Sequence, residues 1–206
     1  SLSKRIYINF DGVYMNSEVW INGKYIAKRP YGYISFRYDI SKFLKQGTNT
    51  IAVRVDNALE PSARWYHPCG IYASVKLIEV NDSHIKPNGI FVSTPKIEKD
   101  KASVNIKVAL SKYKKGLKYS TKILSSLGAV VSNVKQKVKG DKLEVNLVVN
   151  NPKLWSPDTP VLYQVVTQIL DGKKVIDQVT TNFGFKTVKW ETKTGFWLNG
   201  KNVKLK

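Results

Sequence analysis

Residues 18–28 read EVWINGKYIAK, and this stretch decides the class of fold. Asn22-Gly23 is the strongest short-range signal for a β-hairpin. The β-forming residues on both sides of it predict the two strands. Alternating apolar residues then predict further strands at residues 5–10, 33–38, 50–55 and 71–80. The first part of the chain is therefore predicted to be antiparallel β-structure.

Turn-forming residues with little apolar content fill residues 81–89, so we place a domain boundary there. Strands at the spacing of a β-sandwich follow at residues 90–94, 102–110, 119–125, 129–138, 143–149, 161–170 and 175–183. Seven short strands in about 100 residues are typical of an immunoglobulin-like sandwich. Residues 39–44 predict one helical turn capped by Asp39. The predicted fold class is therefore all-β, with two β-sandwich domains.

The chain is expected to divide into residues 1–84, 85–187 and 188–206. The last part carries Trp190, Phe196, Trp197 and Leu198 ahead of a tight turn at Asn199-Gly200. A hairpin this apolar normally packs onto further structure. We therefore expect it to belong to a domain that the chain itself does not contain.

One long loop is the strongest candidate for function. Residues 56–70 read DNALEPSARWYHPCG, which is far longer than a connection of two to six residues. Large aromatic residues such as Trp65 and Tyr66 are depleted in disordered segments. The alternative is structural: the aromatics pack the loop, and Arg64 pairs with Asp56 or Glu60.

The formal charge of +19 resembles that of a nucleic-acid-binding protein, but the basic residues that supply it are mostly lysines. Only five of the 34 basic residues are arginines, and the remaining 29 lysines are spread along the chain. Nucleic-acid readers favour clustered arginine, so we expect no specific nucleic-acid partner. A solvated lysine-rich surface that protects sheet edges is the preferred interpretation. An acidic polysaccharide or a nucleic acid is the competing one.

Other classes of function find little support. No run approaches the eighteen or so apolar residues of a membrane span, so no span is expected. Cys69 is the only cysteine, which excludes an intramolecular disulfide. His67 and Cys69 cannot hold a metal without further ligands. We expect neither a metal nor a cofactor.

Several motifs resemble the non-catalytic N-terminal part of glycoside hydrolase family 2, which contains β-galactosidases, β-glucuronidases and β-mannosidases. In the first domain they are Phe10-Asp11-Gly12-Val13, Glu18-Val19-Trp20-Ile21-Asn22-Gly23, Tyr31-Gly32-Tyr33, Val53-Arg54-Val55-Asp56-Asn57, Arg64-Trp65-Tyr66 and Gly70-Ile71-Tyr72. In the second they are Leu154-Trp155-Ser156-Pro157, Phe183-Gly184-Phe185-Lys186 and Gly195-Phe196-Trp197-Leu198-Asn199-Gly200-Lys201. The resemblance covers essentially the whole chain.

The resemblance implies a partial jelly-roll sugar-binding domain, an immunoglobulin-like sandwich, and a hairpin that opens a (β/α)8 barrel. A retaining glycosidase needs two carboxyl groups, and the family places both glutamates on the barrel, the acid/base after an asparagine. No Asn-Glu pair occurs in this sequence. We therefore expect no catalytic residue and no turnover here. The expected role is to brace the barrel of a glycosidase by intramolecular contact. The commonest similar sequences imply a β-galactosidase-like enzyme.

The resemblance also assigns the loop to the substrate pocket. It implies that Arg64 bonds a sugar hydroxyl or carboxylate, that Trp65 and Tyr66 offer apolar faces to a sugar ring, and that Asp56 is a further contact. The alternative function is a free-standing carbohydrate-binding or adhesive module. The sequence leaves open whether the protein forms a homo-oligomer, and it does not indicate a compartment. The resemblance implies a bacterial periplasmic or secreted parent enzyme.

Overall fold

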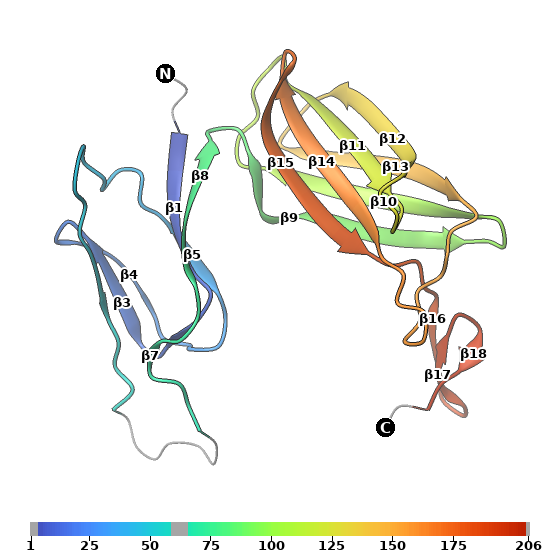
Figure 1. The fold of residues 1–206 in the computed structure, drawn as a ribbon, viewed down its shortest axis with the longest axis horizontal. Helices are drawn as coiled ribbons and strands as arrows, with labels where there is room; N and C mark the ends of the chain where they lie inside the picture. The colour runs from blue at the N-terminus through green and yellow to red at the C-terminus, as the bar shows by residue number, and fades with distance from the viewer. Residues whose placement is uncertain (1–3, 59–65, 205–206) are drawn as a thin grey trace. The chain divides into compact units, whose positions relative to one another are not determined.

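The computed structural model describes residues 4–58 and 66–204 (Figure 1). All of its regular elements are β-strands, as the sequence predicts. Internal contacts divide the chain into two compact units, Ser1–Asp82 and Ser83–Lys206. Within the described residues, no helix has the length and hydropathy that crossing a membrane would require.

The described residues of the first unit form strands β1 (Lys4–Phe10), β2 (Val13–Tyr14), β3 (Ser17–Ile21), β4 (Lys24–Arg29), β5 (Phe36–Asp39), β6 (Ile51–Arg54), β7 (Gly70–Ile71) and β8 (Val75–Asn81). Two sheets have the strand orders β5-β1-β8 and β4-β3-β6, and β2 pairs with β7. Asn22 and Gly23 have φ values of 51° and 78°. The β3–β4 hairpin needs these positive values, and its two turn residues supply them.

The core of the first unit is open along one edge. Ile8 and Phe10 on β1 are buried, and their partners across the ladder are Leu77 and Val75 on β8. Directly opposed residues of an antiparallel pair share one face of a sheet, so these β8 side chains also face the core. Leu77 is nevertheless 65% exposed and Val75 44%. The first unit is therefore a partial sandwich.

The predicted helical turn at residues 39–44 is wrong in type, because the segment is a hydrogen-bonded turn without a helix. Phe43 N donates to Ile40 O over 2.9 Å, and Asp39 Oδ1 accepts from Ser41 N over 3.0 Å. Asp39 does stabilise the start of the turn, as a cap would. Its other oxygen accepts from Arg5 over 2.9 Å, which ties the turn to β1.

Replacing Asp39 with Asn is expected to destabilise the protein by about 1–2 kcal/mol at neutral pH, because charge-assisted hydrogen bonds are lost. Partial burial alone would raise the pKa of Asp39, but hydrogen bonds from Ser41 and Arg5 outweigh it and lower that pKa below 3.8. The stabilisation is therefore complete above pH 3.8 and is lost as the pH falls further. Urea unfolding from pH 7 to pH 3 should show the two proteins converging. Asp158→Asn, on an exposed loop, should change little at any pH.

The second unit contains the seven predicted strands: β9 (Ile85–Ile97), β10 (Lys101–Leu110), β11 (Lys118–Leu124), β12 (Val130–Lys137), β13 (Lys142–Asn150), β14 (Tyr163–Asp171) and β15 (Lys174–Phe183). They form sheets of order β13-β10-β9 and β12-β11-β14-β15. The core lies between the two sheets and includes Val104, Ile106, Ile123, Val165 and Phe185, all fully buried. The immunoglobulin-like sandwich is thus confirmed as a two-layer β-structure.

Strand β9 begins at Ile85 and runs through residues 86–89, where the sequence predicts only turns. Pro87 is tolerated because β9 is the edge strand of its sheet. The backbone is irregular here: Asn88 has a φ of 54°, and the register against β10 shifts between Val108 and Leu110. The turn formers therefore produce a bulge within an edge strand.

A small three-stranded sheet ends the described chain: β16 (Val188–Glu191), β17 (Gly195–Leu198) and β18 (Lys201–Asn202). Asn199 holds it to the preceding segment, because its side chain donates to Trp155 O over 2.9 Å and accepts from Thr187 N over 2.9 Å. Trp190 stays 67% exposed. That this hairpin opens a barrel remains a prediction.

Candidate functional site

The two ends of the loop at residues 56–70 are bonded to β2 and to the two residues that follow it. At its start, Asp56 N donates to Met15 O over 3.0 Å, and Asn16 Nδ2 donates to Asp56 O over 3.0 Å. At its end, Gly70 on β7 pairs with Tyr14. Asn16 has a φ of 49°, which asparagine tolerates better than most residues. Both ends of the loop, which together we call its base, therefore have defined positions.

Aromatic side chains cluster at this base. The ring of Tyr14 stacks on His67, with 5.0 Å between centroids and 4° between planes. Tyr33 meets Tyr14 edge-on at 5.2 Å and Tyr31 at 5.8 Å, and its hydroxyl contacts His67 Nδ1. We call Tyr14, Tyr31, Tyr33 and His67 the tyrosine cluster. It brings together residues that are up to 53 positions apart in the chain.

A depression of about 360 Å³ lies beside the tyrosine cluster and is lined by Tyr14, Met15, Asn16, Pro30, Tyr31, Gly32 and Tyr33. Tyr31 and Tyr33 remain 57% and 47% exposed. Partial desolvation of the Tyr33 hydroxyl, together with nearby Tyr14, raises the pKa of Tyr33 above its ordinary value. Apolar rings beside hydroxyl donors suit a sugar, which has apolar ring faces and polar edges.

Two of the four predicted contact residues, Arg64 and Trp65, lie outside the described residues. Tyr66 is described and is 92% exposed. Asp56 Oδ1 accepts from Ala58 N over 3.2 Å, and Asp56 Oδ2 lies 3.5 Å from Arg54 Nη2. The Asp56 carboxylate thus holds the start of the loop.

Tyr14, Tyr33 and His67 are candidate site residues that no sequence pattern indicated. Each lies on a different segment, so no spacing links them. One sequence feature does point to the cluster: Gly32 lies between two tyrosines, where a side chain packs closely against the backbone. A Cβ at Gly32 would lie 2.3 Å from the Tyr14 ring, so only glycine admits that ring against the backbone.

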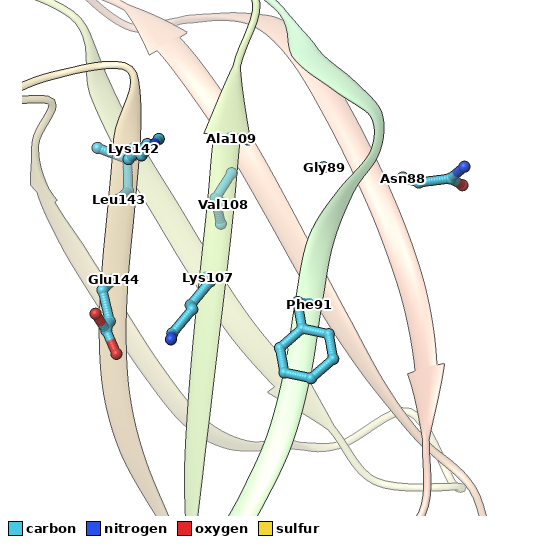
Figure 2. A pocket seen from close by; sticks show the side chains of 9 residues that line it. All are labelled: Asn88, Gly89, Phe91, Lys107, Val108, Ala109, Lys142, Leu143 and Glu144. Carbon is cyan, nitrogen blue, oxygen red and sulfur yellow. The ribbon is translucent and has the colours of Figure 1, made fainter.

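A second depression, of about 460 Å³, lies on the outer face of the sheet β13-β10-β9 (Figure 2). Phe91, Lys107 and Glu144 stand side by side on β9, β10 and β13, whereas Asn88 points away from them. Phe91 is 64% exposed. Since a cation and a carboxylate are neighbours here, this face has no single sign of charge.

The described glutamates already have polar partners. Their partners are Lys28 and Arg54 for Glu18, Lys4 for Glu79, Lys96 and Lys101 for Glu98, Asn105 for Glu144, and Lys189 for Glu191. Hydrogen bonds from lysine lower the pKa of Glu98 and of Glu191. A glycosidase general acid needs the opposite shift. Across residues 4–58 and 66–204, no group of three His, Cys, Asp or Glu is placed to hold a metal.

Comparison with known families accounts for both units. Residues 1–81 match "Glycosyl hydrolases family 2, sugar binding domain", and residues 83–186 match "Glycosyl hydrolases family 2". The chain belongs to glycosyl hydrolase family 2. Membership confirms the resemblance and assigns the loop and the tyrosine cluster to the family's sugar-binding domain.

Individual members of family 2 resemble this chain over nearly its whole length. A putative beta-glucuronidase of Formosa agariphila is 65% identical over 206 residues, which is 100% of this chain and 20% of that protein. A beta-galactosidase of Bacteroides ovatus is 37% identical over 96% of this chain and 24% of that protein. A family 2 crystal structure from Bacteroides cellulosilyticus has a TM-score of 0.92 at 37% identity, covering 98% of this chain and 27% of that one. The chain thus spans about a quarter or less of these curated relatives.

Proposed function

We propose that this chain is the non-catalytic N-terminal part of a family 2 glycoside hydrolase that cleaves O-glycosidic bonds. In this role it braces the catalytic barrel and contributes the loop at residues 56–70 to one wall of the substrate pocket. The observation that carries the proposal is the tyrosine cluster, an exposed aromatic and hydroxyl surface at the base of the loop in a sugar-binding domain.

The engaged glutamates support the absence of catalysis by this chain alone. A retaining mechanism requires one protonated and one ionised carboxyl group about 5–5.5 Å apart. The pure 206-residue chain should release no nitrophenol from aryl β-galactosides, β-glucuronides or β-mannosides. A longer protein that continues past Lys206 should release it. Turnover by the pure chain, with host glycosidases excluded, would refute the proposal.

The substrate is a separate question within the same proposal. The resemblance favours a β-galactoside, and the relative in Bacteroides ovatus is a beta-galactosidase. The 65% identical relative is a putative beta-glucuronidase, which makes a β-glucuronide the competing substrate. Comparing kcat/KM of the longer protein on both aryl glycosides distinguishes them.

Tyr66→Ala in the longer enzyme is expected to raise KM roughly three- to tenfold with little change in kcat, because an aromatic contact to the substrate ring is worth about 0.5–1.5 kcal/mol. Tyr66 is 92% exposed, so its removal should not disturb folding. Tyr113→Ala in the second unit is the matched control and should leave KM unchanged. Equal KM values for all three proteins would remove Tyr66 from the pocket.

A further inference from the structure

Lysines gather on the outer face of the sheet β12-β11-β14-β15. On β11, Tyr119, Thr121 and Ile123 are buried toward the core, so Lys118 and Lys122 point outward. The residues paired with these lysines on β12 and β14, and those paired in turn on β15, point outward as well. The outward residues are Lys118, Ser120, Lys122, Leu124, Val130, Asn133, Lys135, Lys137, Gln164, Val166, Gln168, Leu170, Val175, Gln178, Thr180 and Asn182. We call this set the lysine face.

The lysine face carries four cations and no carboxylate. Strands β11 and β12 contain no Asp or Glu. Asp171, at the end of β14, pairs with Lys114 over 2.7 Å. Asp177 on β15 lies opposite buried Ile169 and accepts from Ile85 N over 2.7 Å. The four lysines are all exposed and take part in none of the ion pairs among the described residues.

The arrangement of these lysines opposes folding. Lys118 lies directly across the ladder from Lys137, and Lys135 is the next outward residue along β12. Like charges directly opposite each other destabilise a sheet. A negatively charged ligand on this face would remove that repulsion.

Edge protection does not explain the pattern. Lysines on an edge strand discourage pairing with other chains, which accounts for Lys135 and Lys137 on β12. Lys118 and Lys122 lie on β11, an interior strand. A surface built for solubility mixes both signs of charge, as the opposite face of the sandwich does with Lys107 beside Glu144 (Figure 2).

Side-chain amides lie beside the lysines on this face, together with two hydroxyl residues and several aliphatic ones. Gln168 Nε2 donates to Gln178 Oε1 over 2.7 Å, and Gln164, Asn133 and Asn182 extend the set. Amides both donate and accept hydrogen bonds, as sugar hydroxyls require. The lysine face has no aromatic residue on which a nucleic-acid base could stack, and no arginine to read base edges. These features favour an acidic polysaccharide over a nucleic acid.

We infer that the lysine face is a second carbohydrate-binding surface, which binds an anionic polysaccharide through Lys118, Lys122, Lys135 and Lys137. The ammonium groups neutralise carboxylate or sulfate groups, and the amides bond hydroxyls between them. The surface is built only from residues of the second unit, so it does not depend on the loop at residues 56–70. Its affinity falls with added salt, because exposed charges are screened.

The test compares the full chain with a variant in which all four lysines are replaced by Gln. Alginate is the anionic probe, dextran the neutral one, and a short DNA duplex the nucleic-acid one. The native chain should bind alginate at low salt, ignore dextran, and gain thermal stability with alginate. The variant should bind alginate at least about tenfold more weakly and lose the thermal shift, while its own melting temperature at low salt stays equal or rises.

A matched variant separates this face from charge in general. Lys99, Lys107, Lys142 and Lys153 are exposed, make no ion pair among the described residues and lie off the lysine face. Replacing these four by Gln removes the same charge and should leave alginate affinity within about twofold. Equal losses in both variants, no alginate binding by the native chain, or tighter binding of DNA than of alginate would each overturn the inference.

Discussion

Phe185→Ala is expected to lower the free energy of unfolding of the second unit by about 3–5 kcal/mol. Phe185 is completely buried, and its ring contacts Tyr163 at 4.8 Å and Phe183 at 5.1 Å between centroids. Its carbonyl also accepts from Trp155 N over 2.7 Å. Truncation removes the aromatic contacts and leaves a cavity at the end of the sandwich.

Urea unfolding checks this prediction, and the chain supplies a control of the same residue type. Phe91 lies on the outer sheet face and is 64% exposed, so Phe91→Ala should cost less than about 1 kcal/mol. Similar losses for both variants would mean that Phe185 does not form part of the core.

Gly32→Ala is expected to destabilise the first unit by about 1–3 kcal/mol through overpacking. The added Cβ would lie 2.3 Å from Tyr14 Cδ2 and 3.1 Å from Tyr14 Cα. The ring of Tyr14 must then move, and His67, which stacks on it, moves as well. Because the loop at residues 56–70 starts and ends on this base, kcat/KM of the longer enzyme should fall by about tenfold or more.

The control for this variant is Gly140→Ala, since nothing lies within 4 Å of a Cβ there. It should change stability by less than about 0.5 kcal/mol and leave kcat/KM unaltered. Destabilisation by Gly32→Ala without any loss of kcat/KM would show that the tyrosine cluster is structural only. If stability and kcat/KM both stay unchanged, the ring of Tyr14 is not held against Gly32.

Local patterns predicted the strands well because each depends on neighbouring residues. The alternation Ala102, Val104, Ile106 and Val108 gives β10 one buried face and one exposed face, as observed. Where two local signals competed, tertiary context decided. Pro87 and Gly89 favour a turn, but as members of an edge strand they are accommodated by a bulge in β9.

The candidate site was only partly predictable. The length of the loop at residues 56–70 marked it as a candidate site, and the sugar contact of the exposed Tyr66 stays a prediction. The sequence placed Asp56 with the sugar contacts, which stays a prediction, and its carboxylate accepts a hydrogen bond from Ala58 N at the start of the loop. Nothing in the sequence linked Tyr14 to His67, because their contact depends on the pairing of β2 with β7.

By itself, the sequence determined an all-β chain of family 2, since a period of two, hairpin turns and family motifs are all local properties. Only the tertiary structure decided which side chains share a surface. Strand pairing brings Lys118 opposite Lys137 and the Tyr14 ring against Gly32, although the members of each pair lie at least 18 positions apart in the chain. Register and backbone approach set these contacts, because a one-residue slip of a strand would turn every side chain to the other face.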